Sequence, residues 1–290
     1  MSVPQIVQDN VAQIDLALMG LLESCTLPIF VEKWKYMRPH ATGTLLRIAD
    51  LHFITTAAHA VIEAAGEGCP LLVGGLSSSK VFGLPEQITR TGRGSMADLA
   101  VWRVRPQDVG LFENKRFLTL EDLWLYAVDP GQGPFVLHGF FADERLAAGP
   151  DLPVGRVDSV RLYMNCYSGP APVENYRAED HLLFSGNPSH VFGQGGMPTS
   201  IPPCELLGIS GSGVFGVSLN GGRHRLVAIE TRKQTGAIQG TRVRWLIELI
   251  GTKYQVVRDV VIRHCEQDQW EAEERRKLLI AQIRGEAEQP

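Results

Sequence analysis

The stretch Leu206-Leu-Gly-Ile-Ser-Gly-Ser-Gly-Val-Phe-Gly216 decides how the rest of the chain is interpreted. Ser210 stands between residues that include three glycines, and glycine lacks a Cβ, so the backbone can turn sharply and direct its N–H groups outward. An acyl-transfer site needs this arrangement, because a nucleophile must lie beside donors that stabilise a tetrahedral intermediate. The structural alternative is a hairpin turn before a buried strand. On this stretch alone, both interpretations stay open.

Two upstream segments bear on that choice. His59 follows the β-rich run Phe53-Ile-Thr-Thr and two alanines, so we expect an imidazole at the end of a strand. Asp98 opens the apolar run Leu99-Ala-Val-Trp, which is also typical of a strand. Each residue alone has an ordinary structural explanation, as a core histidine or a turn-capping aspartate. The order histidine, aspartate, serine along one chain gives the three residues a joint interpretation.

The segments Thr56-Ala-Ala-His59, Asp98-Leu-Ala-Val101 and Gly208-Ile-Ser-Gly-Ser212 resemble the three motifs of the chymotrypsin/trypsin-like serine peptidases, and most of all those of compact bacterial members. The resemblance extends over roughly residues 28 to 250. The chain departs from the usual motif at Gly213, where proline is common. It also has Ile209 where vertebrate enzymes carry the aspartate that pairs with a freed amino terminus.

The resemblance implies a role for each motif residue. His59, whose ordinary pKa lies near 6.5, would act as general base for Ser210, and Asp98 would accept the other ring N–H. The backbone N–H groups of Gly208 and Ser210 would form the oxyanion hole. Ser212 is the rival nucleophile. It stands two places after Ser210, where the family has a glycine or serine that is not the nucleophile. An α/β-hydrolase elbow would need glycine at that position and the opposite triad order.

The implied fold is all-β, with two antiparallel six-stranded β-barrels of the chymotrypsin type and added terminal helices. We predict a helical extension over residues 1–27, a first barrel over 28–128, a second barrel over 129–250 and a C-terminal helix over 251–290. Short β-rich runs separated by turn signals support the barrels. The predicted strands are 28–31, 43–48, 53–56, 71–73, 87–90, 99–102, 135–141, 159–164, 181–184, 214–217, 225–229 and 242–245.

The bulk properties narrow the function classes. The 290 residues are 44% hydrophobic, and the net charge of −4 provides no basic field for nucleic acid or an anionic membrane. We find no secretion signal or apolar membrane span, so we expect a cytoplasmic location. Five cysteines without a C-x-x-C pair fit a reducing compartment. The histidines show no zinc-ligand spacing, and we expect neither a metal nor another cofactor.

Substrate preference is less well determined. The resemblance places Cys204 at the base of the first specificity pocket, and Thr231, Arg232 and Lys233 along its wall. The lack of a carboxylate at position 204 argues against a preference for lysine or arginine. Arg232 would favour an acidic side chain if its guanidinium faces the pocket, and has no such effect if it is solvated. We leave the specificity open.

The terminal segments have two interpretations. Apolar residues recur at helical spacing between residues 5 and 24, and again between 256 and 265, while residues 266–277 are almost all polar. Both segments are either structural helices or docking elements for a regulatory protein partner.

Taken together, the sequence leads us to expect a cytoplasmic serine endopeptidase that acts on protein or peptide substrates and is selective or partner-regulated. The alternatives are a catalytically inactive binding module and a non-proteolytic serine esterase.

Overall fold

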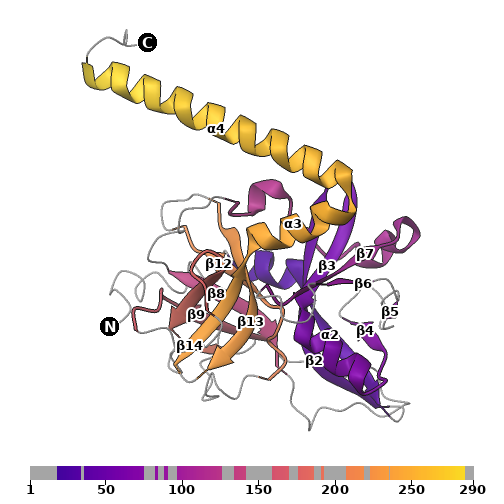
Figure 1. The fold of residues 1–290 in the computed structure, drawn as a ribbon. Coiled ribbons are helices and arrows are strands. Elements are labelled where there is room, and N and C mark those ends of the chain that lie inside the picture. The colour runs from indigo at the N-terminus through magenta and orange to yellow at the C-terminus, as the bar shows by residue number, and fades with distance from the viewer. Residues whose placement is uncertain are drawn as a thin grey trace.

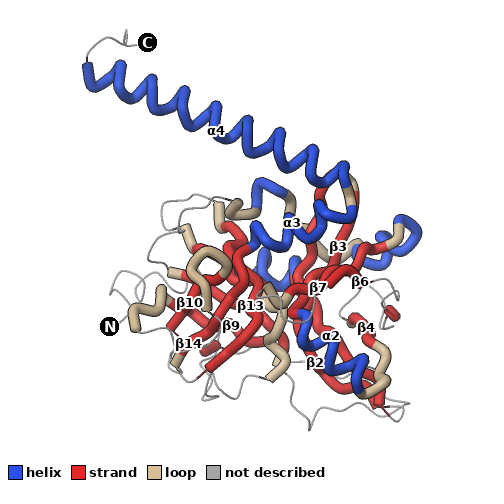
Figure 2. The backbone as a smooth tube through the Cα atoms, viewed as in Figure 1, coloured by secondary structure: helices blue, strands red, loops and turns tan. Residues whose placement is uncertain are grey.

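The chain folds mostly into β-structure, with two curled antiparallel sheets and several helices (Figure 1). The structure is a computed structural model. It describes residues 18–33, 36–74, 82–83, 88–90, 97–125, 134–141, 159–169, 176–185, 191–192, 207–218, 223–234 and 236–284. Figure 2 shows the two sheets side by side, with helices packed at their edges.

The first sheet has seven strands in the order β5-β4-β1-β2-β3-β7-β6, and each neighbouring pair is antiparallel. Its strands are β1 Thr26–Lys33, β2 Tyr36–Ile48, β3 Leu51–Ala57, β4 Leu71–Val73, β5 Phe82–Gly83, β6 Ile88–Arg90 and β7 Leu99–Val104. All six strands predicted for this half are present. The seventh, β5, has only two residues, which is too short to produce an alternating pattern in the sequence.

The second sheet also has seven antiparallel strands, in the order β10-β14-β13-β12-β8-β9-β11. Its strands are β8 Phe135–Phe140, β9 Ser159–Met164, β10 His181–Ser185, β11 Val191–Phe192, β12 Gly213–Gly216, β13 Arg225–Gln234 and β14 Ala237–Arg242. The prediction missed β11 and β14. The consecutive strands β13 and β14 pair directly and form a hairpin. In this hairpin, β13 lies next to β12, the strand that follows Ser210, and β14 lies on the far side of β13.

The predicted strand over residues 242–245 is wrong. Strand β14 ends at Arg242, and helix α3 runs over Val243–Lys253. Arginines alternate with Val243 and Trp245, which imitates the two-residue period of a strand. The longer window instead buries Val243, Leu246, Ile247 and Ile250, the i, i+3, i+4, i+7 spacing of a helix face.

Several helices complete the fold. They are α2 Ala58–Gly66, the 3₁₀ helices η1 Pro106–Phe112 and η2 Leu120–Asp122, α3, and α4 Gln255–Arg284. The predicted C-terminal helix therefore exists, and in Figure 1 most of α4 projects away from the two sheets. Residues 18–25 are helical, whereas the rest of the predicted N-terminal helix lies outside the described residues. Within the described ranges, no helix is both long enough and apolar enough to span a membrane.

One apolar cluster joins the two sheets. Phe53 and Leu99 from the first sheet, Phe215 and Leu226 from the second, and Leu246 from α3 all belong to it and are fully buried. Two further clusters fill the interior of each sheet separately. Because the shared cluster spans both sheets, the position of one sheet relative to the other is fixed by buried contacts.

The Ser210 loop, defined as residues 207–212, is held against the first sheet by hydrogen bonds. The backbone N–H of Thr42 donates to the carbonyl of Ser210 at 2.9 Å. The hydroxyl of Thr44 donates to the carbonyl of Gly211 at 3.1 Å. On the opposite side, the Gly211 N–H donates to the carbonyl of Glu230 on β13 at 2.9 Å. The loop is thus bonded to both sheets at once.

Gly211 is required at its position by both conformation and space. Its φ of 90° lies in the left-handed region, where a Cβ is unfavourable. A Cβ there would lie 2.0 Å from the Thr56 hydroxyl and 2.3 Å from the Thr42 carbonyl oxygen. The carbonyl oxygen belongs to a paired strand, so it cannot move without disturbing the first sheet.

We predict that Gly211→Ala lowers the free energy of unfolding by about 2–5 kcal/mol, because left-handed strain adds to the steric clash with the sheet. Gly236→Ala is the matched control: Gly236 also has a positive φ, of 80°, but a Cβ there meets nothing within 4 Å. For the control, we expect the free energy of unfolding to fall by about 1 kcal/mol. Urea denaturation followed by circular dichroism measures both, and equal losses would contradict the close-packed loop.

Candidate active site

Asp98 organises the first turn of helix α2. The backbone N–H of Ala58 donates to the Asp98 carbonyl oxygen at 3.0 Å, and that of His59 donates to its Oδ1 at 2.9 Å. The N-cap residue, Ala57, has no side chain that can bond to these groups. A helix begins with unpaired N–H donors and a positive end of its dipole, so an anion is stabilised there. The carboxylate of Asp98 therefore replaces a conventional N-cap.

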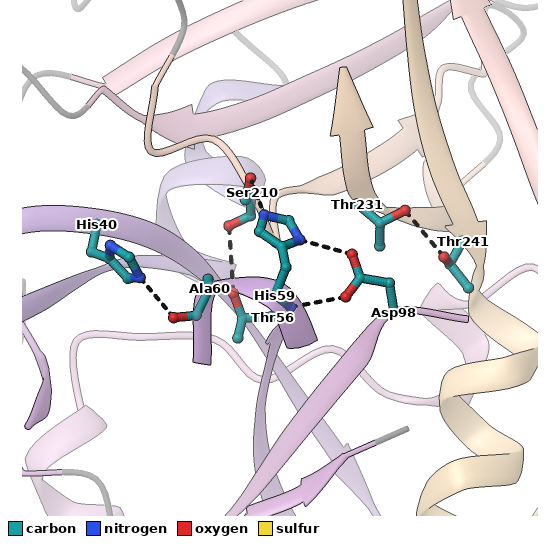
Figure 3. A network of polar contacts seen from close by, with 8 residues as sticks. All are labelled: His40, Thr56, His59, Ala60, Asp98, Ser210, Thr231 and Thr241. Carbon is teal, nitrogen blue, oxygen red and sulfur yellow. Dashed lines mark hydrogen bonds and ion pairs between the residues drawn. The ribbon is translucent and has the colours of Figure 1, made fainter. Parts of the chain in front are cut away.

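The structure brings His59, Asp98 and Ser210 into one chain of contacts (Figure 3). The Nδ1 of His59 lies 2.7 Å from Oδ2 of Asp98, and its Nε2 lies 3.0 Å from the Ser210 hydroxyl. An ionised carboxylate only accepts hydrogen bonds, so the ring proton belongs on Nδ1. Nε2 is then the acceptor for the Ser210 O–H. This is the arrangement of a serine whose proton can be removed by a neighbouring base.

Two candidate backbone donors lie on the Ser210 loop itself. Gly208 has a φ of 88°, a conformation that favours glycine. Its carbonyl is held by the Thr42 hydroxyl at 3.0 Å. Within the described part of the chain, the N–H groups of Gly208 and Ser210 make no hydrogen bond to another residue. They are therefore available to an external acceptor, as the sequence-based prediction of an oxyanion hole requires.

The rival serine is placed elsewhere. Ser212 has no exposed surface, and its hydroxyl has no hydrogen-bond partner among the described residues. A Cβ built on Gly139 of β8 would lie 2.2 Å from that hydroxyl, so Ser212 is packed against the β8 backbone. The hydroxyl that lies within hydrogen-bond distance of His59 is that of Ser210.

A cleft of about 610 Å³ opens at these residues. One wall comes from the first half of the chain, with residues from β2 and α2, and the other from the Ser210 loop and β13. The cleft is lined by Arg38, Pro39, His40, His59, Ala60, Glu63, Glu67, Asp98, Leu207, Gly208, Ser210, Arg232 and Lys233. Predicted wall residues Arg232 and Lys233 thus do line the same cleft as Ser210.

The other predicted substrate-binding residues differ in outcome. Thr231 does not line the cleft; it is 2% exposed, and its hydroxyl lies 3.2 Å from that of Thr241 on β14. A register shift between Glu230 and Arg232 disturbs the regular alternation of β13, so neighbouring residues could not be assigned to one face from sequence. Cys204 lies outside the described residues.

The charges around His59 raise its pKa. Burial is the largest influence and acts to lower the pKa, because it disfavours the imidazolium. The hydrogen bond to Asp98 and the negative charges of Asp98, Glu230 and Glu63 outweigh it. The imidazole is therefore a somewhat stronger base than a free histidine side chain, and its charged form is stabilised where a proton from Ser210 would arrive.

A buried acidic residue beside the site was missed by the sequence-based prediction. Glu230 on β13 is fully buried, and neither carboxylate oxygen has a hydrogen-bond partner among the described residues. Burial raises its pKa to about 7; the charges of His59 and Lys233 act to lower it, and that of Asp98 raises it further. The available signal was an isolated acidic residue directly after the apolar run Leu226-Val-Ala-Ile229.

The site has no arrangement of ligands for a metal ion among the residues described: no group of three or more His, Cys, Asp and Glu side chains is suitably placed. The four described cysteines, Cys25, Cys69, Cys166 and Cys265, form no disulfide bond with one another.

Comparisons with known proteins assign this chain to no family. No protein-family model and no curated protein matches the chain. One solved structure is titled "Aromatic interactions drive the coupled folding and binding of the intrinsically disordered Sesbania mosaic virus VPg protein". It is 12% identical, with a TM-score of 0.41, over 77% of this chain and 87% of that chain. A likeness at this level gives no grounds for transferring an activity. Two curled antiparallel half-barrels are nonetheless compatible with a chymotrypsin-like fold.

We predict that Glu230 makes the protein less stable as the pH rises. A carboxyl whose pKa is about 7 in the folded chain and 4.5 outside it binds more protons when folded, so stability falls between pH 4.5 and about 7. Relative to Glu230→Gln, the wild type should lose roughly 3 kcal/mol between pH 4.5 and pH 8.

Urea denaturation at several pH values measures this difference. Thr231→Val, a buried change on the same strand that removes no ionisable group, is the control. The difference in free energy of unfolding between Thr231→Val and the wild type should not vary with pH. A constant difference for Glu230→Gln would contradict the unpaired, buried carboxyl.

Proposed function

We propose that this protein is a serine endopeptidase with a chymotrypsin-like double-barrel fold, in which His59, Asp98 and Ser210 form the catalytic triad. One observation supports the proposal above all others: the His59 ring bridges the Asp98 carboxylate at 2.7 Å and the Ser210 hydroxyl at 3.0 Å. The three residues come from α2, the start of β7 and the Ser210 loop, and they meet at an open cleft large enough for a peptide segment.

The first half of the reaction forms an acyl-enzyme. The Ser210 oxygen attacks the carbonyl carbon of the scissile peptide bond while Nε2 of His59 takes the hydroxyl proton. Asp98 stabilises the resulting imidazolium through Nδ1–H. The carbonyl oxygen becomes an oxyanion, which accepts hydrogen bonds from the N–H groups of Gly208 and Ser210. The intermediate then expels the amine, which receives its proton from His59, and an ester to Ser210 remains.

The second half of the reaction hydrolyses that ester. A water molecule attacks the acyl carbon and gives one proton to Nε2 of His59, and a second tetrahedral intermediate forms in the same oxyanion hole. When this intermediate collapses, the Ser210 oxygen leaves and takes the proton back from His59. The released product is a carboxylic acid, and the enzyme returns to its starting state.

We also propose that the activity is restricted, by narrow selectivity or by a protein partner, in a cytoplasmic setting. The terminal helices are the candidate docking elements. Helix α4 carries Val256 and Ile262, which are 48% and 47% exposed. An apolar groove between α3 and α4 includes Ile262, Ile247 and Val261. A contiguous exposed apolar patch is typical of surfaces that bind other proteins, whereas isolated exposed apolar residues are ordinary, so the groove is the feature that supports this proposal.

The proposed function predicts covalent labelling of Ser210 by a fluorophosphonate probe. Such probes react with serines that are activated by a base, so labelling should disappear in Ser210→Ala and in His59→Ala. Ser212→Ala is the matched control and should retain labelling, since its buried hydroxyl does not contact His59. Intact mass spectrometry detects the adduct and peptide mapping locates it.

The outcomes separate the candidate functions. Labelling at Ser210 together with cleavage of peptide libraries supports the endopeptidase. Labelling with hydrolysis of esters but of no peptide would identify the esterase. An unlabelled, folded wild-type chain would leave the inactive binding module as the better explanation.

We predict that Asp98→Asn lowers kcat by about ten-thousandfold, the size of effect that this substitution has in Ser-His-Asp triads. The amide can no longer accept both N–H groups, so the ring is not held in the required tautomer and the imidazolium loses its counter-charge. Measured kcat values for peptide cleavage test this, with a thermal melt as the control for folding. A loss of less than about tenfold would remove Asp98 from the proposed triad.

A further inference from the structure

Thr42 on β2 bonds to the Ser210 loop and to the second sheet through a single hydroxyl. The hydroxyl donates to the carbonyl oxygen of Gly208 at 3.0 Å and accepts from the backbone N–H of Phe140 on β8 at 2.9 Å. The backbone of the same residue also binds the loop, because the Thr42 N–H donates to the Ser210 carbonyl at 2.9 Å. Thr42 therefore holds the loop on both sides of Ile209.

The Thr42 side chain is itself fixed by its surroundings. Thr42 is fully buried, and its own carbonyl accepts from the Thr56 hydroxyl at 2.8 Å. A Cβ built on Gly139 of β8 would lie 3.1 Å from the Thr42 hydroxyl oxygen, so the second sheet packs closely against that group. A β-branched side chain also has few accessible χ1 rotamers. The hydroxyl is therefore held between the Gly208 carbonyl and the Phe140 N–H.

Gly208 needs such an external restraint. Its φ of 88° is one of several conformations that glycine adopts at similar cost, so the residue itself does not fix the direction of the adjoining peptide groups. In the part of the chain that the structure describes, the Thr42 hydroxyl is the only hydrogen-bond donor to the Gly208 carbonyl. The Gly208 N–H has no hydrogen-bond partner there that could restrain the residue from its other side.

The second candidate donor of the oxyanion hole is restrained differently. The Ser212 N–H donates to the Ile209 carbonyl at 2.9 Å, and that carbonyl shares a planar peptide group with the Ser210 N–H. Ile209 is also buried in the apolar cluster of the second sheet. The direction of the Ser210 N–H thus depends on the loop itself, whereas that of the Gly208 N–H depends on a side chain from the first sheet.

We propose that Thr42 is a positioning residue for the oxyanion hole: its hydroxyl holds the Gly208 carbonyl and thereby keeps the Gly208 N–H directed at the developing oxyanion. This inference rests on the proposed peptidase function and adds to it a residue that does not line the cleft. Oxyanion stabilisation is effective because the donors are in place before the charge develops. Since the same hydroxyl binds Phe140, the geometry of the oxyanion hole depends on the packing of β2 against β8.

The test measures how fast a fluorophosphonate labels Ser210, because the phosphoryl oxygen gains negative charge in the same oxyanion hole. Thr42→Val keeps the shape of the side chain and removes the hydroxyl. We expect the second-order rate constant to fall by about tenfold to a hundredfold, less than the hundredfold to thousandfold effect of removing one oxyanion donor outright. Labelling should still reach one adduct per folded chain. Thr42→Ser retains the hydroxyl and should react within about threefold of the wild type.

Two controls separate this role from a general loss of structure. Thr26→Val also removes a fully buried hydroxyl with two partners, the Leu22 carbonyl and Nδ1 of His138, each at 2.7 Å, and Thr26 does not line the cleft. Its labelling rate should stay within about twofold of the wild type, although it loses similar hydrogen bonds. The midpoint of the rate against pH reports His59 and should be the same in Thr42→Val and the wild type. A shifted midpoint would mean that the substitution acts through His59, which overturns the inference.

The remaining outcomes distinguish the inference from the proposed function. Equal labelling rates for the wild type and Thr42→Val overturn the inference alone, and so does a Thr42→Ser sample that is as slow as Thr42→Val. A folded wild type that is not labelled overturns the proposed function, and the inference with it. Thr42→Cys is measured alongside in case Thr42→Val fails to fold. A thiol is a weaker donor than a hydroxyl, so we expect labelling about threefold to tenfold slower than in the wild type, and an unchanged rate overturns the inference.

Discussion

The constraint on which the site depends is the bonding of one short loop to two sheets. The Ser210 carbonyl accepts from Thr42 and Thr56 of the first sheet, while Gly211 donates to Glu230 of the second. Each bond contributes only about 1 kcal/mol, but together they fix the backbone on both sides of Ser210. The hydroxyl can then face His59 without a flexible segment having to order itself around a substrate, which lowers the entropic cost of reaching a reactive geometry.

Asp98 couples the formation of a helix to the orientation of a ring. One carboxylate oxygen satisfies the His59 backbone N–H and the other accepts from the ring of the same residue. The residue has a φ of 33°, which is unfavourable for a side chain with a Cβ. This local strain is offset by the bonds that Asp98 makes to α2. A group that is needed for helix initiation cannot move independently of the imidazole, so the ring orientation is fixed by the fold.

Local sequence patterns predicted most of the strands and the three residues that meet at the cleft. Runs such as 53–56 and 99–102 have strong β composition, and their ends were marked by His59 and Asp98. The failures have physical causes. Two-residue strands β5 and β11 have no period, and Val243 and Trp245 between arginines imitate a strand over a window of only about one helical turn. Burial of Glu230 depends on β14 and the Ser210 loop. These two segments are separated in sequence and come together in space only when the sheet forms.

The contrast between Glu230 and Thr231 shows why neighbouring positions in a strand have different consequences. Thr231 is buried with a hydroxyl partner on β14, so its polar group is satisfied within the fold. Glu230 is buried without one, which lowers stability above neutral pH relative to a neutral side chain. Folding alone would favour replacing such a residue by an apolar one, because unpaired buried charges are poor stabilisers. The cost of burying Glu230 therefore grows as its carboxyl ionises, whereas the cost of burying Thr231 does not depend on pH.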